Sequence, residues 1–194
     1  MKSIALLAVA GLATVASAQS ALNVALTFDK TSIAIGETAT ATITASWTGV
    51  AGSYMSSINA NVNASGEFVA ASNVAAVAWN NPALGFNGQG TASGASVLGL
   101  QASQFSLIPP FTATNPILVT TFTVTGTAEG VLSYSSSTVL GAPAPFSVTG
   151  PAFSDNPVFF TNDAFSSGSL TVTPAPSAMA LLGLGGLVAG RRRR

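Results

Sequence analysis

The segment TATATITASW, residues 38–47, alternates polar and apolar side chains without interruption. Its apolar members are Ala39, Ala41, Ile43, Ala45 and Trp47. Successive side chains of a β-strand point to opposite faces of a sheet, so this period of two predicts a strand with one face in a core. Because Trp47 lies in phase with the other apolar residues, the pattern favours a packing role for it over ligand binding.

The same alternation continues on both sides of this segment. In residues 21–29, ALNVALTFD, every second residue from Leu22 to Phe28 is apolar. Seven more strands are predicted at 54–64, 68–79, 95–102, 117–125, 131–139, 146–149 and 169–173, separated by turn-rich segments. Only 6% of the residues are charged, so the usual charged helix formers are scarce. The sequence therefore predicts an all-β, antiparallel two-sheet sandwich.

The first twenty residues, MKSIALLAVAGLATVASAQS, have the layout of a secretory signal peptide. Lys2 is followed by an apolar run over residues 4–15, and Ala16 and Ala18 are the small residues at positions −3 and −1 of a cleavage site. We expect residues 1–18 to form a short signal helix that is removed before Gln19. The alternative is a buried helix of the domain.

The chain ends in TPAPSAMALLGLGGLVAGRRRR, residues 173–194. Its apolar run, residues 178–190, is shorter than the roughly 20 residues that a spanning helix needs. The run ends in a cluster of basic residues, which keeps such a segment's end in the cytoplasm. That cluster consists of Arg191, Arg192, Arg193 and Arg194. The sequence predicts a short C-terminal apolar helix that tethers the protein to the membrane transiently.

This ending resembles a PEP-CTERM sorting signal, which places a Pro-Glu-Pro-like motif before an apolar helix and an arginine-rich end. The motif maps onto Pro174, Pro176 and Ser177, with Ala175 where the usual glutamate stands. The resemblance implies that residues 174–194 are a sorting signal recognised by an exosortase, a membrane enzyme that is thought to cut near the motif. It also implies a bacterium that makes extracellular polysaccharide.

The body, residues 19–173, resembles a cohesin domain in the order of its segments. An opening strand and a Gly-Glu-Thr turn lead into a second strand in LNVALTFDKTSIAIGETATATITASW, residues 22–47. The segments SSINANVNASGEFVAAS (56–72), NPILVTTFTVTGTAEGVLSYS (115–135) and GSLTV (168–172) follow in the same layout. The resemblance implies a nine-stranded, jelly-roll-like sandwich. Cohesins bind dockerin partners through one sheet face.

The amino-acid composition excludes most kinds of catalytic and metal-binding site. There is no cysteine or histidine, which excludes thiol nucleophiles, histidine-based triads and the common zinc sites. A body with six acidic residues and one lysine lacks the basic stripe that nucleic-acid binding requires. Oxygen-bearing side chains in one loop are candidate calcium ligands, but their spacing matches no calcium-binding loop. They are Asp155, Asn156, Asn162 and Asp163. No metal or cofactor is therefore predicted.

Glycoside hydrolysis requires a pair of carboxylates close together. Glu37, Glu67 and Glu129 each lie beside a glycine, where polar turn residues usually sit, and nothing singles out a pair. No catalytic residue is predicted. Trp79 precedes a turn-rich segment, NNPALGFNG, and is the single residue predicted to bind a ligand, by stacking on a sugar ring.

The sequence thus predicts an exported, non-enzymatic bacterial surface or extracellular-matrix protein. It would pass through the inner membrane and be sorted by an exosortase-type enzyme, with extracellular polysaccharide as a candidate partner. The alternative is a carbohydrate- or protein-binding sandwich held by a plain C-terminal membrane anchor.

Overall fold

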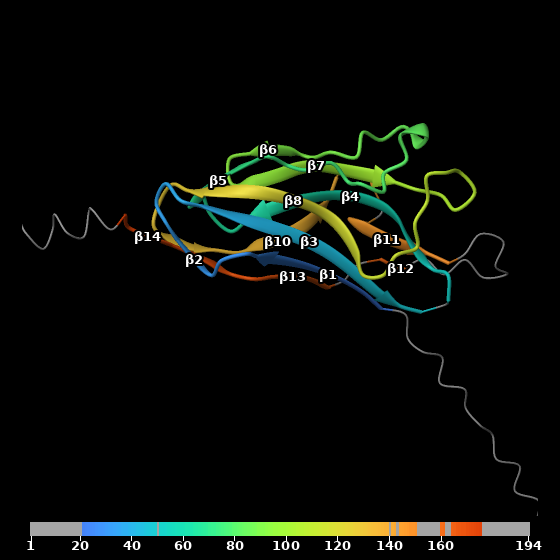
Figure 1. Cartoon of the computed structure of the whole chain (residues 1–194), viewed down its shortest axis with the longest axis horizontal. Helices are drawn as coiled ribbons and strands as arrows, with labels where there is room; N and C mark the ends of the chain where they lie inside the picture. Colours follow the sequence, from blue (N-terminus) through green and yellow to red (C-terminus); the bar gives the residue numbers. More distant parts are fainter. Residues whose placement is uncertain are drawn as a thin grey trace, which may run out of the picture.

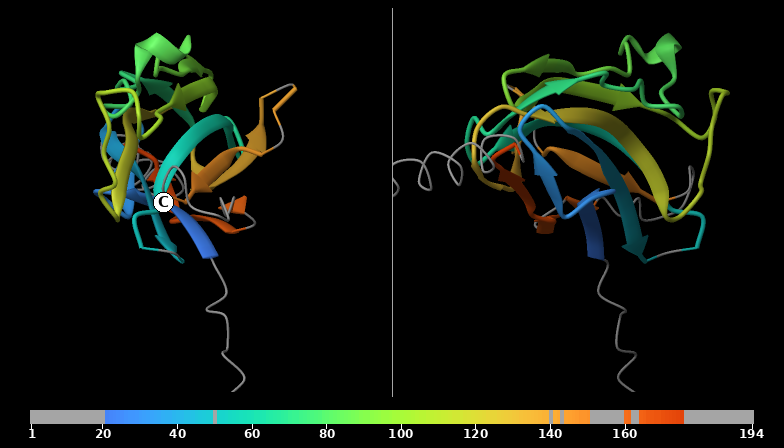
Figure 2. Two further views of the ribbon diagram at one scale, coloured as in Figure 1. Left: turned by 90° about the vertical axis from the view of Figure 1, so that its right-hand side faces the viewer. Right: turned by 60° about the vertical axis from the view of Figure 1, so that its left-hand side comes forward.

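The computed structural model describes residues 21–49, 51–139, 141–142, 144–150, 160–161 and 164–175. These residues form two β-sheets packed face to face, with a small third sheet at one end (Figures 1 and 2). The predicted all-β sandwich is therefore confirmed. The predicted signal helix, the C-terminal helix, Pro176, Ser177 and the four terminal arginines lie outside the described residues. Among the described residues, no helix has the length and apolar character needed to cross a membrane.

The first sheet has five strands, and residues 38–47 lie in the strand at its centre. In spatial order the strands are β13 (Ala164–Ser167), β1 (Ala21–Phe28), β3 (Thr38–Thr48), β8 (Ile117–Gly126) and β5 (Val69–Ser72). Burial alternates along β3 because its apolar residues face the second sheet and its threonines face outward. Its inward residues pair with those of β1, with Leu26 opposite Ile43 and Val24 opposite Ala45.

The second sheet is built around β4, Tyr54–Ala64. Its spatial order is β12 (Phe160–Thr161), β11 (Phe146–Thr149), β4, β7 (Ser96–Ser103) and β6 (Thr91–Ser93). The short strand β10, Tyr134–Thr138, pairs with the half of β4 that β11 leaves free. The third sheet joins β2 (Ser32–Ala34), β14 (Leu170–Thr173) and β9 (Gly130–Leu132).

Three sequence-based expectations are corrected by the structure. The sandwich is not wholly antiparallel, because β1 pairs with β13 and β2 with β14 in parallel. The predicted strand 68–79 is a strand only over Val69–Ser72, since Asn73 turns the backbone into the left-handed region with φ 50°. The predicted strand 131–139 divides into β9 and β10, which belong to different sheets.

The core lies between the two main sheets. Trp47 is 8% exposed, and its indole N–H donates to the Ser53 carbonyl at 3.2 Å, so the predicted packing role is confirmed. Phe122 from β8 meets Tyr134 from β10 edge to face, with ring centroids 5.6 Å apart. The Tyr134 hydroxyl donates to the Ala95 carbonyl at 2.8 Å. Burial, and then the nearby Glu67 carboxylate, raise the pKa of Tyr134 above its ordinary value, so this phenol remains a donor.

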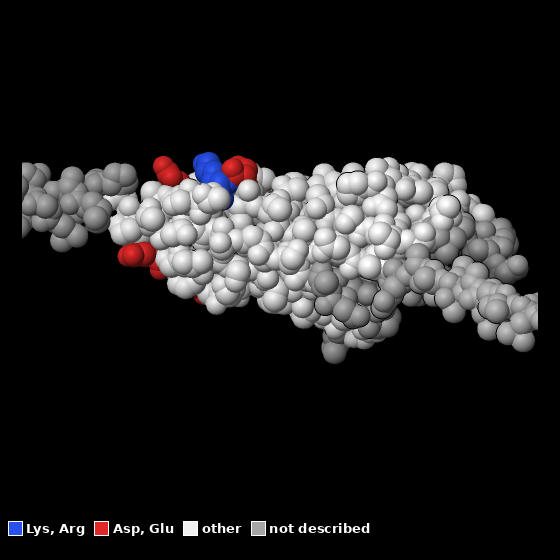
Figure 3. Space-filling view, turned by 90° about the horizontal axis from the view of Figure 1, so that it is seen from below, with Lys and Arg blue, Asp and Glu red and all other residues white. Residues whose placement is uncertain are grey.

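Charge is confined to one end of the described sandwich (Figure 3). The charged residues of the described chain are Asp29, Lys30, Glu37, Glu67 and Glu129. They lie in or beside the turns at the end where β14 finishes (Figures 1 and 3). The opposite end, where the loop between β7 and β8 projects, carries no charged residue among those described.

Candidate functional site

The uncharged end presents a cluster of exposed apolar side chains, which we call the apolar tip. It consists of Phe105, Leu107, Ile108 and Phe111 from the loop between β7 and β8, together with Leu118 from β8. Leu107 is 52% exposed and Leu118 is 49% exposed. Single exposed apolar residues are ordinary on protein surfaces, whereas several gathered on one loop mark an interaction site. Figure 2 shows this loop, in yellow-green, standing off from the end of the sandwich.

Amide side chains hold the loop in shape, and the buried Gln104 is the first of them. It is 2% exposed and lies directly after β7. Its Nε2 donates to the carbonyls of Met55, at 2.8 Å, and Thr112, at 2.9 Å. Its Oε1 accepts the Thr112 backbone N–H at 2.9 Å. Gln104 therefore fastens the returning half of the loop to β4.

Two asparagines fasten the loop at other points. Asn81 is 1% exposed, and its Nδ2 donates to the Ile108 carbonyl at 2.8 Å. Its Oδ1 accepts the Ala83 N–H and caps the short 3-10 helix η1, Pro82–Leu84. Asn115 holds the far end of the loop, where its Nδ2 donates to the Trp47 carbonyl at 2.7 Å and its Oδ1 accepts the Trp47 N–H at 3.2 Å.

A buried tyrosine supports the same loop from below. The Tyr54 hydroxyl accepts the Ser106 N–H at 3.4 Å, and its ring lies edge to face with Phe111 at 4.8 Å between centroids. These contacts fix the backbone that carries the exposed side chains. A loop ordered before binding loses less conformational entropy when a partner docks, so the apolar tip is pre-organised for recognition.

Trp79 lies at the base of the apolar tip. It forms part of the wall of an apolar pocket of about 300 Å³, together with Pro110, Phe111 and Leu118. The indole is 6% exposed, and its N–H donates to the Leu118 carbonyl at 3.1 Å. Trp79 is therefore a largely covered pocket wall and not an open stacking platform. Its predicted role in ligand binding stays a prediction.

Two of the described carboxylates accept hydrogen bonds from backbone N–H groups. Glu37 accepts the Ala34 N–H at 2.9 Å within its own turn, and Glu67 accepts the Ala95 N–H at 3.2 Å. Among the described residues, no group of three or more histidine, cysteine or acidic side chains is placed to hold a metal ion. The calcium candidates Asp155 and Asp163 lie outside the described residues.

Sequence reasoning missed the loop that carries the apolar tip. The stretch IPPFTATNP was interpreted as a connection because of its prolines and polar residues. The sequence feature that could have indicated an exposed binding loop is the presence of large apolar residues in this turn-rich stretch. The three amides that fix the loop gave no signal, since their partners are distant in sequence or depend on the loop's fold.

No known protein family and no curated protein matches this chain by sequence. Solved structures do match it in shape. The seventh ScaB type I cohesin from Pseudobacteroides cellulosolvens superposes with a TM-score of 0.50 at 16% identity, covering 79% of this chain and 94% of that chain. The second type II cohesin module of the ScaA scaffoldin from Acetivibrio cellulolyticus gives 0.52 at 12% identity, covering 83% and 96%.

The described body has the cohesin fold. A third cohesin, from an Acetivibrio cellulolyticus cohesin–X–dockerin complex, gives a TM-score of 0.52 at 11% identity and covers 78% of this chain and 99% of that chain. The cohesin-like sandwich implied by the sequence resemblance is therefore confirmed. The expected number of nine strands is not, because the described residues form fourteen, several of them short. At these identities the likeness concerns the cohesin fold alone.

Proposed function

We propose that this protein is an exported, non-enzymatic binding module whose apolar tip docks a partner protein. The observation that carries the proposal is the set of large apolar side chains held in solvent by a loop that the buried amides of Asn81 and Gln104 fix in place. Exposing such a surface and ordering its backbone both cost free energy, and a docked partner offsets that cost. One solved neighbour of the same fold is described as part of a cohesin–X–dockerin complex, which supports protein recognition as a use of this fold.

The composition of the apolar tip favours a protein partner over a sugar chain. Leu107, Ile108 and Leu118 are aliphatic, and such side chains insert into apolar pockets of another protein. These three side chains offer no flat aromatic face on which a sugar ring stacks. Of the two phenylalanines in the tip, Phe111 already lies edge to face with Tyr54, which leaves Phe105 as the aromatic side chain of the tip with no described ring contact. No charged residue among those described accompanies them, so the complementary surface is expected to be apolar as well.

The position of the apolar tip fits an exported protein that is held through its C-terminal end. The tip and the end of β14 lie at opposite ends of the sandwich, so attachment beyond residue 175 would leave the tip free (Figure 1). Two sequence features support export and sorting: the signal peptide at 1–18 and the PEP-CTERM-like segment at 174–194. An exosortase-type enzyme would process the protein for the cell surface or the matrix. A plain membrane anchor is the alternative.

Mass analysis of the mature protein from its native host tests the sorting step. We expect an N-terminus at Gln19 and a C-terminus between Pro174 and Ser177, because the apolar run after the motif is too short to serve as a lasting span. Recovery of protein ending at Arg194 in the membrane fraction would contradict sorting and support the plain anchor.

Docking through the apolar tip is tested with a displayed random-peptide library screened against the full chain. We expect selected peptides rich in apolar and aromatic residues, with binding at least tenfold weaker to Leu107→Ser, because that change places a hydroxyl where the partner's apolar surface packs. Val131→Ser is the matched control, since Val131 is 58% exposed on β9, which pairs with β14 at the charged end. Failure to enrich any peptide, or equal binding to both variants, would overturn the proposal.

A further inference from the structure

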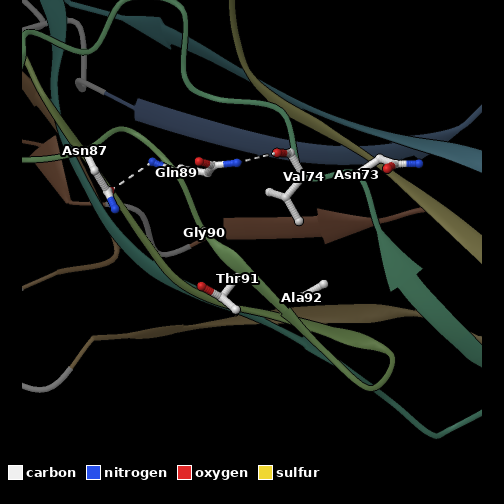
Figure 4. Close-up of a pocket in the computed structure, with 7 residues that line it drawn as sticks. All are labelled: Asn73, Val74, Asn87, Gln89, Gly90, Thr91 and Ala92. Atoms are coloured by element: carbon white, nitrogen blue, oxygen red, sulfur yellow. Dashed lines mark hydrogen bonds between the residues drawn. The ribbon is translucent and has the colours of Figure 1, made fainter.

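A second surface groove is lined mainly by polar side chains, unlike the apolar pocket beside Trp79, and we call it the polar groove. It has a volume of about 420 Å³ and lies between residues 73–74, which follow β5, and residues 87–92, which lead into β6 (Figure 4). Its lining residues are Asn73, Val74, Asn87, Gln89, Gly90, Thr91 and Ala92. All of them are uncharged, and the volume falls in the usual range for small-molecule sites.

The two walls of the polar groove are fixed to one another. Gln89 Nε2 donates to the Val74 carbonyl at 3.1 Å and so spans the groove (Figure 4). The Gln89 backbone N–H donates to Asn87 Oδ1 at 3.1 Å. Behind them, the Val77 N–H donates to the Gly88 carbonyl at 2.7 Å. These bonds define the groove before any ligand arrives.

Backbone conformation adds a second sign of a built site. Asn73 has φ 50°, in the left-handed region that residues other than glycine seldom adopt. Gly88 has φ 70°, and a Cβ there would lie 2.7 Å from Asn80 Cβ, so only glycine fits. Glycine adopts φ 70° without strain, whereas Asn73 carries a conformational cost, and non-glycine residues held in this way cluster at ligand-binding sites.

The polar groove retains unused hydrogen-bonding capacity. Within the described chain, the Asn73 amide and the Thr91 hydroxyl have no hydrogen-bond partner, although both residues are exposed. Asn87 uses only its oxygen and Gln89 uses only its side-chain nitrogen among the bonds formed there. The free groups therefore include both donors and acceptors, and each is neutral.

We propose that the polar groove binds a neutral saccharide. Sugar hydroxyls both donate and accept, which matches a lining of amides and a hydroxyl. Val74, which is 9% exposed, and the partly buried Ala92 add a small apolar area to this lining. An anionic sugar or phosphate would find no cation in the lining, and desolvating its charge would go uncompensated. This site is separate from the apolar tip and does not depend on the function proposed for it.

Amide-resolved NMR titration of the full chain with cellohexaose, xylohexaose and mannohexaose tests the site. We expect at least one of these neutral oligosaccharides to shift the amides of residues 73–74 and 87–92 with a Kd of about 1 mM or tighter, whereas hexagalacturonate leaves them unchanged. Absence of shifts with all three, shifts centred on Trp79, or an equal response to the charged sugar would overturn the proposal.

Two substitutions sharpen the result. Thr91→Val removes the hydroxyl while keeping a β-branched side chain, and Asn73→Gly removes the amide while permitting φ 50°. Each should weaken saccharide binding several-fold, and Thr38→Val, an exposed threonine on the other main sheet, should not. Leu107→Ser should leave saccharide binding unchanged. Unaltered binding by both groove variants would contradict the assignment even if a sugar binds elsewhere.

Discussion

Replacing Gln104 with alanine should lower the free energy of unfolding by about 3 kcal/mol and release the loop that carries the apolar tip. The substitution deletes three hydrogen bonds, to the Met55 carbonyl and to both backbone groups of Thr112. A buried polar group left without a partner costs about 1–3 kcal/mol, so the penalty comes from the groups left behind. Denaturant unfolding measures the stability, and hydrogen exchange at the Thr112 amide measures the loop.

Gln101→Ala is the matched control for this change, because it alters the same residue type three positions earlier, on β7. Gln101 is only partly buried, and its Nε2 makes a hydrogen bond of 3.2 Å with Asn59 Oδ1. We expect its stability to change by less than about 0.5 kcal/mol. The Gln104 variant should also lose binding to the selected peptides, and the control should keep it. Protection of the Thr112 amide equal to that of the unsubstituted chain would show that Gln104 does not fix the loop.

Phe122→Ala should cost about 3–5 kcal/mol of unfolding free energy, the usual range for removing a buried aromatic ring. Phe122 is 1% exposed between the two main sheets, and its ring packs edge to face on Tyr134. The cavity left behind would also loosen the Tyr134 ring, whose hydroxyl bonds to Ala95. Thermal or denaturant unfolding of the full chain measures the loss.

Phe105→Ala removes the same type of side chain from an exposed position, and it should affect binding more than stability. Phe105 is 40% exposed in the apolar tip, so its removal should alter stability by less than about 1 kcal/mol while weakening peptide binding. Under conditions where Phe122→Ala is still folded, that variant should bind peptides normally. A large stability loss from Phe105→Ala would mean that the apolar tip is part of the core and not a docking surface.

The central strands were predictable from sequence because their pattern and their environment agree. Each inward position of β3 is apolar and each outward position is polar, and this pattern leaves one register for a sheet with one buried face. The end of β5 was not predictable in the same way. Residues 74–79 remain rich in alanine and valine, and the backbone turn at Asn73 interrupts the strand without changing that composition.

The candidate sites escaped sequence reasoning because hydrogen bonds between distant residues shape them. Asn115 bonds to Trp47, 68 positions earlier, and Asn81 bonds to Ile108, 27 positions later. The sequence around an asparagine does not indicate which distant residue its side chain will bond to. Trp79 was predicted to lie near a loop, and it does, but the indole is covered because β8 supplies both a hydrogen-bond acceptor and apolar neighbours.

The separation of charge from the apolar tip has a kinetic consequence. Long-range attraction between charges accelerates the encounter of many protein pairs, but the docking end has none to contribute among the described residues. A partner should therefore associate at the unsteered rate of about 10⁵–10⁶ M⁻¹s⁻¹, and ionic strength should hardly change that rate. Selectivity among partners would then arise from how long each complex lasts once its apolar surface is buried.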